Sequence, residues 1–394
     1  MYEKIVIVGA GPSGSSAAIR LLESDVTKEV TIYEKRKQIG FPPRCAGGLH
    51  GSRAEAHDIK IPEEIIKARI KKLVFKSPHQ VAEFNFSELG FDDLKYYSID
   101  RTMFDQILAK KAESMGAKVE TNVEVWGLRG SQGLEVWGPQ IGTPVGTSQN
   151  VRQVRFDVLI AAAGFKEGPF SDLFEVPPTE DKEMATCLQY VMRVKDYPQD
   201  TMTFIFGKEI APGGYAWIFP AGDYDVRVGL GIPMSMRCNP GTYLDALVER
   251  MWWTKGQNFK EAVCRMLPTT KPLKTGVVRD NIILAGDQLH ATDPLTGGGI
   301  IPAILTGRAA ADAILKGNIR CYDQLWKPIL EENKARYRAK KLFAMSDKKL
   351  DRLVELFSQF RPKELKPGEE VRQLLKFIAR KDPLLLASLV RILL

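Results

Sequence analysis

The N-terminal region contains the feature that most constrains the fold, a glycine pattern set between two apolar runs. The run KIVIV at 4–8 predicts a buried strand, which Gly9, Gly11 and Gly14 follow before SSAAIRLLES predicts a helix. The run EVTIYEK then predicts a second strand that carries Glu34, 20 residues after Gly14. This order indicates a Rossmann-like unit that binds a dinucleotide: a strand, the GxGxxG pattern, a helix, and a second strand that ends in an acidic residue.

Each residue of this pattern has a physical role in holding a dinucleotide. Gly9 makes the tight turn, Gly11 lets the backbone approach a pyrophosphate, and Gly14 lets the helix pack against the strand. The helix N-terminus offers N–H groups and a positive dipole to the phosphates. Glu34 can accept hydrogen bonds from the adenosine ribose hydroxyls.

Composition narrows the class of protein further. The chain has 394 residues, of which 44% are hydrophobic and 26% charged, as in a soluble globular protein of one large or two ordinary domains. The net charge of +8 comes from scattered lysines and arginines, which argues against nucleic-acid binding and suits a solvated structural face or an anionic membrane surface. The five cysteines form no CxxC pair, so we expect no metal site, no disulfide framework and a cytoplasmic setting.

Strand and helix patterns along the chain predict a mixed α/β fold that contains a separate antiparallel β layer. FDVLIAAAG at 156–164 predicts another buried parallel strand, and 97–115 predicts an amphipathic helix with Phe104, Ile107 and Leu108 facing inward. Strands alternate from 182 to 275 with one helical stretch, which predicts an antiparallel sheet.

The domain organisation follows from this alternation. We expect a Rossmann-like domain at 1–180 and 276–320, with cap elements near 60–100, split by an inserted antiparallel-sheet substrate domain at 181–275. A helical C-terminal region should cover 321–394, where apolar positions at helical spacing lie beside lysines and arginines. These helices either pack on the cofactor domain or form an interfacial element that contacts a lipid surface without spanning it.

A second glycine cluster lies in NIILAGDQLHATDPLTGGGI. A predicted strand ends at Asp287, and Gly297, Gly298 and Gly299 open a long predicted helix. An acid at a strand end can bind a ribityl hydroxyl, and glycine amides at a helix start can hold the O2/N1 edge of a flavin. Together with the N-terminal pattern, this cluster predicts an FAD site.

The pair of signatures resembles the FAD site of the para-hydroxybenzoate-hydroxylase-like flavoproteins. Within that group, four stretches resemble the geranylgeranyl reductase family, with the archaeal digeranylgeranylglycerophospholipid reductases as the nearest branch. The stretches are GFPPRCAGGL at 40–49, LQYVMR at 188–193, PGGYAWIFP at 212–220 and DPLTGGGI at 293–300. The resemblance runs through almost the whole chain and implies FAD-dependent saturation of C=C bonds in the geranylgeranyl chains of membrane ether-lipid precursors. It also implies a protein that lies peripherally on the inner face of the cell membrane.

The resemblance also implies which residues contact the cofactor. The matching positions are Ser15, Glu34, Cys45, Ala46, Gly48, Arg101, Val125, Asp287, Gly299 and Ile300. We add Arg44, Gly297 and Gly298 as neighbours of these positions. Val125 also fits plain strand core, and Arg101 also fits a surface helix start.

The substrate side is expected in the antiparallel sheet. Tyr215, Trp217 and Phe219 alternate along one predicted strand, so they should project from one face, either as ordinary core or as the wall of a site for a flat apolar chain. We expect Cys45, Tyr215 and Trp217 to serve the reaction, with Cys45 or Tyr215 as proton donor. His290 either relays a proton or packs in its loop.

Other functions stay open at this point. Ala163-Gly164 stands where relatives with aromatic-hydroxylase chemistry carry Asp-Gly, which argues against that chemistry and leaves the electron donor open among NAD(P)H, ferredoxin or another carrier. The alternatives are a flavin monooxygenase or halogenase, a flavoprotein that passes electrons to a quinone, and a reductase of another prenyl substrate such as a chlorophyll precursor or menaquinone.

Overall fold

The structure is a computed structural model that describes most of the chain. The described residues are 2–24, 29–129, 132–138, 150–165, 169–176, 179–251, 259–273, 276–361 and 369–393. They divide into two compact units, each assembled from three segments of the chain. Unit 1 comprises Met1–Pro43, Arg101–Thr179 and Pro268–Lys334, and unit 2 comprises Arg44–Asp100, Glu180–Leu267 and Ala335–Leu394.

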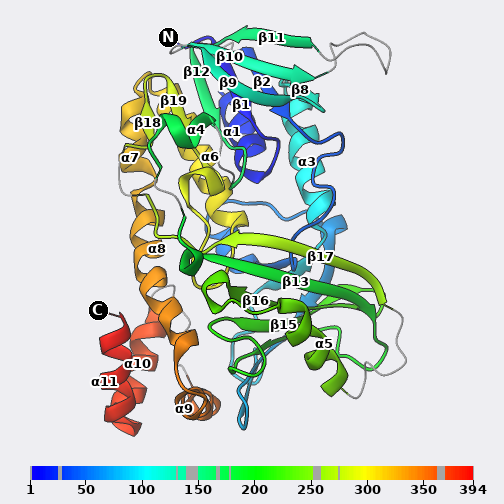
Figure 1. Cartoon of the computed structure of the whole chain (residues 1–394), viewed down its shortest axis with the longest axis vertical. Helices are drawn as coiled ribbons and strands as arrows, with labels where there is room; N and C mark the ends of the chain where they lie inside the picture. The colour runs from blue at the N-terminus through cyan, green and yellow to red at the C-terminus, as the bar shows by residue number, and fades with distance from the viewer. Residues whose placement is uncertain are drawn as a thin grey trace. The chain divides into compact units, whose positions relative to one another are not determined.

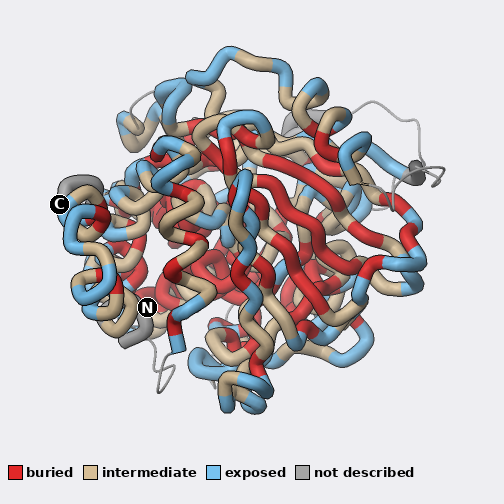
Figure 2. Tube along the Cα trace, turned by 90° about the horizontal axis from the view of Figure 1, so that it is seen from below, coloured by how far each residue is buried: buried red, intermediate tan, exposed pale blue. Residues whose placement is uncertain are grey.

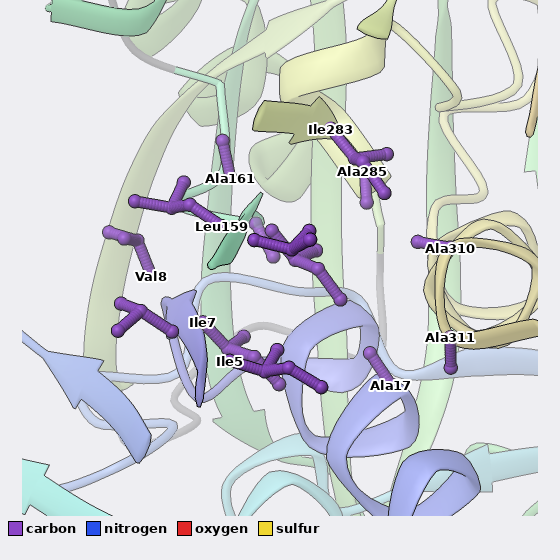
Figure 3. Close-up of a cluster of buried hydrophobic side chains, with 14 of the residues drawn as sticks. Ile5, Ile7, Val8, Ala17, Leu159, Ala161, Ile283, Ala285, Ala310 and Ala311 are labelled. Atoms are coloured by element: carbon purple, nitrogen blue, oxygen red, sulfur yellow. The ribbon is translucent and has the colours of Figure 1, made fainter. Parts of the chain in front are cut away.

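Unit 1 is built on a largely parallel sheet. Across the described residues its strand order is β18-β19-β12-β1-β2-β8, and only the short edge strand β18 runs antiparallel (Figure 1). The strands are β1 (Lys4–Val8), β2 (Glu29–Glu34), β8 (Lys118–Thr121), β12 (Val158–Ala161), β18 (Val278–Arg279) and β19 (Ile282–Leu284). Their near-continuous apolar runs follow from burial on both faces, and Ile5 and Ile7 are fully buried beside Leu159 and Ile283 (Figure 3). The predicted strands at 4–8, 29–34 and 156–164 are confirmed.

Helices of unit 1 pack tightly through small residues. The helices are α1 (Pro12–Leu22), α3 (Arg101–Ser114), α4 (Pro169–Leu173), α6 (Ile300–Leu315) and α7 (Tyr322–Leu325). A Cβ added at Gly307 on α6 would overlap the carbonyl oxygen of Ser13 on α1, so glycine is required where these two helices meet. Ala17, Ala310 and Ala311 lie at the same contact and belong to the buried core of the unit (Figure 3).

A small antiparallel sheet completes unit 1. Among the described residues its order is β11-β10-β9, formed by β9 (Glu124–Arg129), β10 (Gly133–Gly138) and β11 (Asn150–Arg155). Leu134 and Val136 of β10 are fully buried in the core of the unit.

Unit 2 is built on a larger sheet with the order β17-β13-β16-β15-β14-β5-β6 over the residues described. Its strands are β5 (Lys72–Lys76), β6 (Val81–Asn85), β13 (Met184–Arg193), β14 (Thr201–Ile205), β15 (Tyr215–Gly222), β16 (Asp225–Pro233) and β17 (Phe259–Pro268). The antiparallel sheet expected from 182 to 275 is confirmed for β13 to β16, whereas β14 pairs with β5 in parallel. A second sheet of β4 (Ile66–Ile70), β7 (Tyr96–Ile99) and β3 (Gly48–His50) lies in the same unit with the short helix α2 (Gly51–Glu55).

The two faces of the large sheet bury different sets of side chains. Ala216 and Ile218 of β15 belong to the cluster that packs with Leu244 and Leu247 of α5 (Pro240–Arg250). The alternate residues of β15 belong to a separate cluster on the opposite face. Buried residues accordingly form long runs along the strands, and exposed residues gather in the connecting loops (Figure 2).

The division of the chain differs from the expected domain bounds in two places. Residues near 60–100, expected as cap elements of the Rossmann-like domain, group with the large sheet because β5 pairs with β14 and β6 pairs with β5. The C-terminal residues from Ala335 onward also group with unit 2. The helix expected over 97–115 begins only at Arg101, because residues 96–99 pair with β3 and β4 as strand β7.

The C-terminal region is helical, as expected. It contains α8 (Lys327–Ala339), α9 (Asp347–Gln359), α10 (Glu369–Lys381) and α11 (Pro383–Leu393). Leu350 and Leu356 of α9 share a buried cluster with Ile378 of α10 and with Leu385 and Leu389 of α11. Within the parts of the chain that the structure describes, no helix combines the length and apolarity needed to cross a bilayer.

Candidate functional site

The turn between β1 and α1 has the geometry that its glycines predict. Gly9 has a φ of +105°, and a Cβ there would overlap the carbonyl oxygen of Ala162. A Cβ at Gly14 would overlap the Gly9 carbonyl oxygen and lie 3.0 Å from Cγ2 of Ile7. Gly9 therefore makes the turn, and Gly14 allows the close approach of α1 to β1.

The N-terminus of α1 leaves room for a phosphate group. Gly11 is the N-cap residue; among the described residues no side chain caps the helix, and a Cβ at Gly11 would meet no atom within 4 Å. The first N–H groups of a helix lack partners inside the helix, so they can donate to an anion that approaches Gly11. Ser15, an expected cofactor contact, is fully buried and donates its hydroxyl to the Ala10 carbonyl at 3.0 Å, which fixes the turn.

Ser13 is a residue that sequence reasoning missed. Its side chain is 5% exposed, and its buried Oγ has no hydrogen-bond partner among the described residues. A Cβ at Gly286 would lie 3.2 Å from this Oγ, so the hydroxyl lies beside the loop that leads to Asp287. Buried hydroxyls are nearly always paired, and this one therefore fits a ligand group held at the start of α1. The only indication of this role in the sequence is the position of Ser13 between Gly11 and Gly14.

Glu34 lies at the end of β2, where its carboxylate accepts two backbone hydrogen bonds. Oε2 accepts from the Ala10 N–H and Oε1 from the Arg36 N–H, both at 2.9 Å. Each carboxylate oxygen can accept more than one bond, so Glu34 can hold the glycine turn and still bind ribose hydroxyls. A pocket of about 610 Å³ in the loop that follows β2 is lined by Arg36, Lys37, Gln38 and Phe41.

Arg101 begins α3 and forms an ion pair with a buried carboxylate. Its Nη2 donates to both oxygens of Asp105 at 2.9 Å, and both side chains are largely buried. Burial raises the pKa of Asp105, while the Arg101 charge and hydrogen bonds and the charge of Arg36 act in the opposite direction. Arg101 is therefore part of a packed charge cluster near Glu34 rather than a surface helix start.

The second glycine cluster lies at the N-terminus of α6. Gly299 is its N-cap residue, and no side chain in the described part of the chain caps the helix. Asp287 lies in a 3₁₀ turn (Gly286–Leu289) directly after β19 and accepts a hydrogen bond from Thr292 at 2.5 Å. A Cβ at Gly299 would lie 3.4 Å from Oδ1 of Asp287, so this carboxylate and the open helix end lie together, as the flavin interpretation requires.

The neighbours of this helix end have structural roles. Asp293 accepts hydrogen bonds from Leu295 and Thr296, which closes the loop that carries Gly297 and Gly298. Ile300 is buried at the start of α6. His290 lies 5.5 Å from the Phe165 ring, and its Nδ1 lies 3.4 Å from the Lys271 oxygen, so the contacts observed are those of a packed loop residue.

Val125 lies in β9, paired with Val136 of β10, and its side chain packs against the core of unit 1. This is the environment of a core residue, and its contact with a cofactor stays a prediction.

The expected cofactor residues of the RCAGG stretch lie in unit 2. The Sγ of Cys45, a free cysteine, accepts a hydrogen bond from the Gly47 N–H at 3.3 Å. Ala46 packs against the cluster of Met202, Trp217 and Phe219, and a Cβ at Gly48 would lie 3.0 Å from Cε2 of Phe219.

Tyr215, Trp217 and Phe219 project from one face of β15, as the alternation predicts. Trp217 is 8% exposed and Phe219 6% exposed, and both pack with Ile70 and Met202. Tyr215 is only partly buried, with its ring 5.9 Å from that of Trp217. Phe204 continues this aromatic face, 5.3 Å from Phe219. Trp217 and Phe219 are thus packed side chains, and their contact with a substrate stays a prediction.

Two family models match the chain over the parts just described. The model for the geranylgeranyl reductase catalytic domain matches residues 183–265, which carry β13 to β17. The model for an NAD(P)-binding Rossmann-like domain matches residues 7–45, which carry the glycine turn and Glu34. Both of the expected architectures are therefore present.

Two proteins that are similar over nearly the full length of this chain are named as geranylgeranyl reductases or as similar to them. A digeranylgeranylglycerophospholipid reductase of Methanoculleus marisnigri is 33% identical over 98% of this chain and 96% of its own length. The crystal structure of a geranylgeranyl bacteriochlorophyll reductase-like protein from Thermoplasma acidophilum superimposes with a TM-score of 0.84 at 26% identity, over 99% of both chains.

The fold extends beyond reductases. The flavin-dependent brominase Bmp2 has a TM-score of 0.64 at 18% identity over 100% of this chain and 93% of its own, a likeness of fold alone. Flavin binding agrees with the helix ends at Gly11 and Gly299 and with the Ser13 hydroxyl, because in the part of the chain that the structure describes no side chain caps either helix and the hydroxyl has no partner. The long match to curated reductases and the catalytic-domain match distinguish this chain from the brominase, and the chain belongs to the geranylgeranyl reductase family of oxidoreductases.

Proposed function

We propose that this protein saturates C=C double bonds in the geranylgeranyl chains of membrane ether-lipid precursors, with FAD as its cofactor. The observation that carries the proposal is the match over nearly the full length to a relative named digeranylgeranylglycerophospholipid reductase. Chlorophyll precursors and menaquinone carry the same kind of prenyl chain, so these substrates are outcomes that the experiment below separates.

The residues of unit 1 fit FAD. Gly11, with the N–H groups of α1 and the hydroxyl of Ser13, would hold the pyrophosphate, because no described side chain caps this helix and the Ser13 hydroxyl has no hydrogen-bond partner among the described residues. Glu34 would hold the ribose. Asp287 and the N–H groups of α6 behind Gly299 would hold the ribityl chain and the polar edge of the ring, where the helix dipole favours negative charge.

The aromatic face of unit 2 fits the prenyl chain. An isoprenoid chain forms no hydrogen bonds, so its binding site must be apolar and complementary in shape to the chain. The face formed by Tyr215, Trp217 and Phe219 supplies adjacent rings, and Tyr215 is the member that is partly exposed. When bound and reduced by an electron donor, FAD would supply the hydride equivalent for one carbon of the double bond. The other carbon needs a proton, and we assign its delivery to Cys45 or Tyr215.

The C-terminal helix α11 supports contact with a lipid surface. Leu384 is 84% exposed and Val390 39% exposed on a helix whose Leu385 and Leu389 are buried in its cluster. The preceding helix α10 ends in Arg380 and Lys381, whose charge suits anionic headgroups. We infer peripheral membrane binding on the cytoplasmic face, which vesicle flotation of Leu384→Asp against the unmodified protein would test: loss of flotation from anionic vesicles is expected.

The decisive experiment uses the purified protein under anaerobic conditions. After reconstitution with FAD and reduction by dithionite, a geranylgeranyl glycerophospholipid should gain about 2 mass units per double bond by mass spectrometry. Geranylgeranylated chlorophyll precursors and menaquinone are assayed in parallel, and preferential saturation of either would reassign the substrate. A product that forms only with oxygen would contradict reduction and favour the monooxygenase or halogenase alternative.

A further inference from the structure

The loop at 44–47, which carries Cys45, is held onto the large sheet of unit 2 by side chains from neighbouring strands. Three consecutive backbone oxygens of the loop each accept a hydrogen bond from a different strand, in the order β17, β13 and β16. The pairs are Arg265 with the Arg44 oxygen at 3.4 Å, Gln189 with the Cys45 oxygen at 3.4 Å, and Arg227 with the Ala46 oxygen at 3.2 Å.

This order is the order of the strands in the sheet. Each bond is long, and one alone would fix little. Because consecutive carbonyls match consecutive strands, the three bonds together fix the direction in which the loop crosses the sheet. The exit of the loop is fixed as well, since Gly47 accepts from the Ile99 N–H at 2.8 Å and a Cβ at Gly47 would lie 2.5 Å from Nη1 of Arg227.

Gln189 is the member of this set that reaches a second residue of the site. Its side chain is 5% exposed, its Nε2 donates to Cys45, and its Oε1 accepts from the indole N–H of Trp217 at 3.3 Å. The indole can only donate and the Cys45 carbonyl can only accept, so the orientation of the amide is determined by its partners. A glutamate cannot donate when ionised, and a methionine of similar length can neither donate nor accept.

Packing around Gln189 holds this bridge in place. A Cβ at Gly229, the residue paired with Gln189 across β13 and β16, would lie 2.6 Å from Cζ2 of Trp217 and 2.7 Å from Cβ of Gln189. Glycine at this position therefore leaves the room in which the indole and the amide meet. Ala46 packs in the same apolar cluster as Trp217, so the loop and the aromatic face contact each other through both polar and apolar groups.

We propose that Gln189 is a positioning residue for the reaction, because its amide links the backbone of Cys45 to the indole of Trp217 and so fixes the loop relative to the aromatic face. Its importance for the reaction rests on the proposed function, which assigns roles to Cys45 and Trp217. An isoprenoid chain cannot position itself by hydrogen bonds, so the groups around it must be held in place beforehand. Gln189 supplies that restraint for residues that lie far apart in the sequence.

The test compares Gln189→Met and the shorter Gln189→Asn with a matched control on the same strand. Tyr190→Phe removes the 2.7 Å hydrogen bond from the Tyr190 hydroxyl to Asp245, on the opposite face of β13. We expect Gln189→Met to lower kcat for prenyl reduction about tenfold or more, with KM and FAD content unchanged, as for displaced reacting groups. The control should keep the kcat of the unmodified protein.

A double-mutant cycle and a labelling experiment exclude a merely structural effect. In the cycle, Gln189→Met and Trp217→Phe should lower kcat non-additively, since Trp217→Phe removes the same hydrogen bond. Alkylation of the native protein by a maleimide, followed by mass spectrometry of the Cys45 peptide, should be faster in Gln189→Met than in Tyr190→Phe. An additive cycle, or equal labelling in both variants, would overturn the proposal.

The labelling experiment needs no lipid substrate and thus separates the two proposals. If the unmodified protein reduces no prenyl lipid, the proposed function is wrong, whereas faster labelling of Cys45 in Gln189→Met still supports the link. If the lipid is reduced but Gln189→Met has normal kcat and normal labelling, the positioning role is wrong and the proposed function stands.

Discussion

Replacing Gly11 by alanine should weaken cofactor binding while leaving the fold intact. Gly11 has φ −73° and ψ −175°, which alanine adopts without strain, and its Cβ would meet nothing within 4 Å. Alanine is a poorer N-cap residue than glycine by roughly 1 kcal/mol, while the less flexible unfolded chain of the variant offsets about 0.4–1 kcal/mol of this loss. The free energy of unfolding of the apoprotein should therefore change by less than about 1 kcal/mol.

Binding of FAD should respond differently, because the methyl group would occupy the space that the pyrophosphate needs. Loss of one hydrogen bond between a backbone N–H and a charged phosphate costs about 1.5–3 kcal/mol. The dissociation constant for FAD should accordingly rise about ten- to a hundredfold. Urea unfolding of the apoprotein and titration with FAD, followed by flavin fluorescence, measure the two quantities separately.

Gly14→Ala is the matched control, because the two glycines are three residues apart and only Gly14 is in tight contact. Its Cβ would overlap the Gly9 carbonyl oxygen, so the variant should lose about 1–3 kcal/mol of stability even without FAD. If Gly11→Ala binds FAD as tightly as the unmodified protein, the pyrophosphate does not lie at this turn. If Gly14→Ala is as stable as the unmodified protein, the packing argument is wrong.

Two further predictions concern unit 2. Trp217→Ala should keep FAD bound but abolish lipid reduction, and it should lower the free energy of unfolding by about 3–5 kcal/mol, the cost of removing a buried aromatic ring. Calorimetry should show no comparable loss of stability in Trp126→Ala, because Trp126 is 63% exposed. Loss of FAD from Trp217→Ala would indicate that Trp217 has a purely structural role. Burial alone would raise the pKa of Asp351, but hydrogen bonds from Ser77 and His79 lower it overall. The stability that this carboxylate contributes is present above about pH 3.9 and is lost as the pH falls below that value through the lowered pKa of the folded state. The midpoints of urea unfolding of Asp351→Asn and of the unmodified protein should therefore differ at pH 7, and the difference should shrink as the pH falls below about 3.9. A difference that does not change with pH would refute the assignment.

The cofactor side of the site could be predicted from sequence because its determinants are local. Gly9, Gly11 and Gly14 act within one turn and the adjoining strand and helix, so their spacing carries the geometry. Ser13 belongs to the same turn, yet its role depends on Gly286, whose proximity no local pattern reveals. The turn that carries Ser13 and the loop that carries Gly286 come together only when the sheet has formed.

The substrate side could be predicted only in part. Alternation along β15 predicts that Tyr215, Trp217 and Phe219 share a face, and they do. The pairing of β5 with β14 joins residues more than 120 positions apart, and no local pattern specifies such a partner. The bridge from Gln189 to Cys45 spans 144 positions for the same reason.

The arrangement of polar groups in unit 2 has a physical rationale. A prenyl chain binds by contact area alone, and contact area cannot specify which double bond lies at the reacting position. The specificity must come from a surface that does not rearrange around the chain. Trp217 and Phe219 meet this need through burial, and Trp217 is further held by its single N–H donor to Gln189. The buried amide costs little because both of its ends are paired, and it connects the Cys45 loop to Trp217 on β15, a central strand of the sheet.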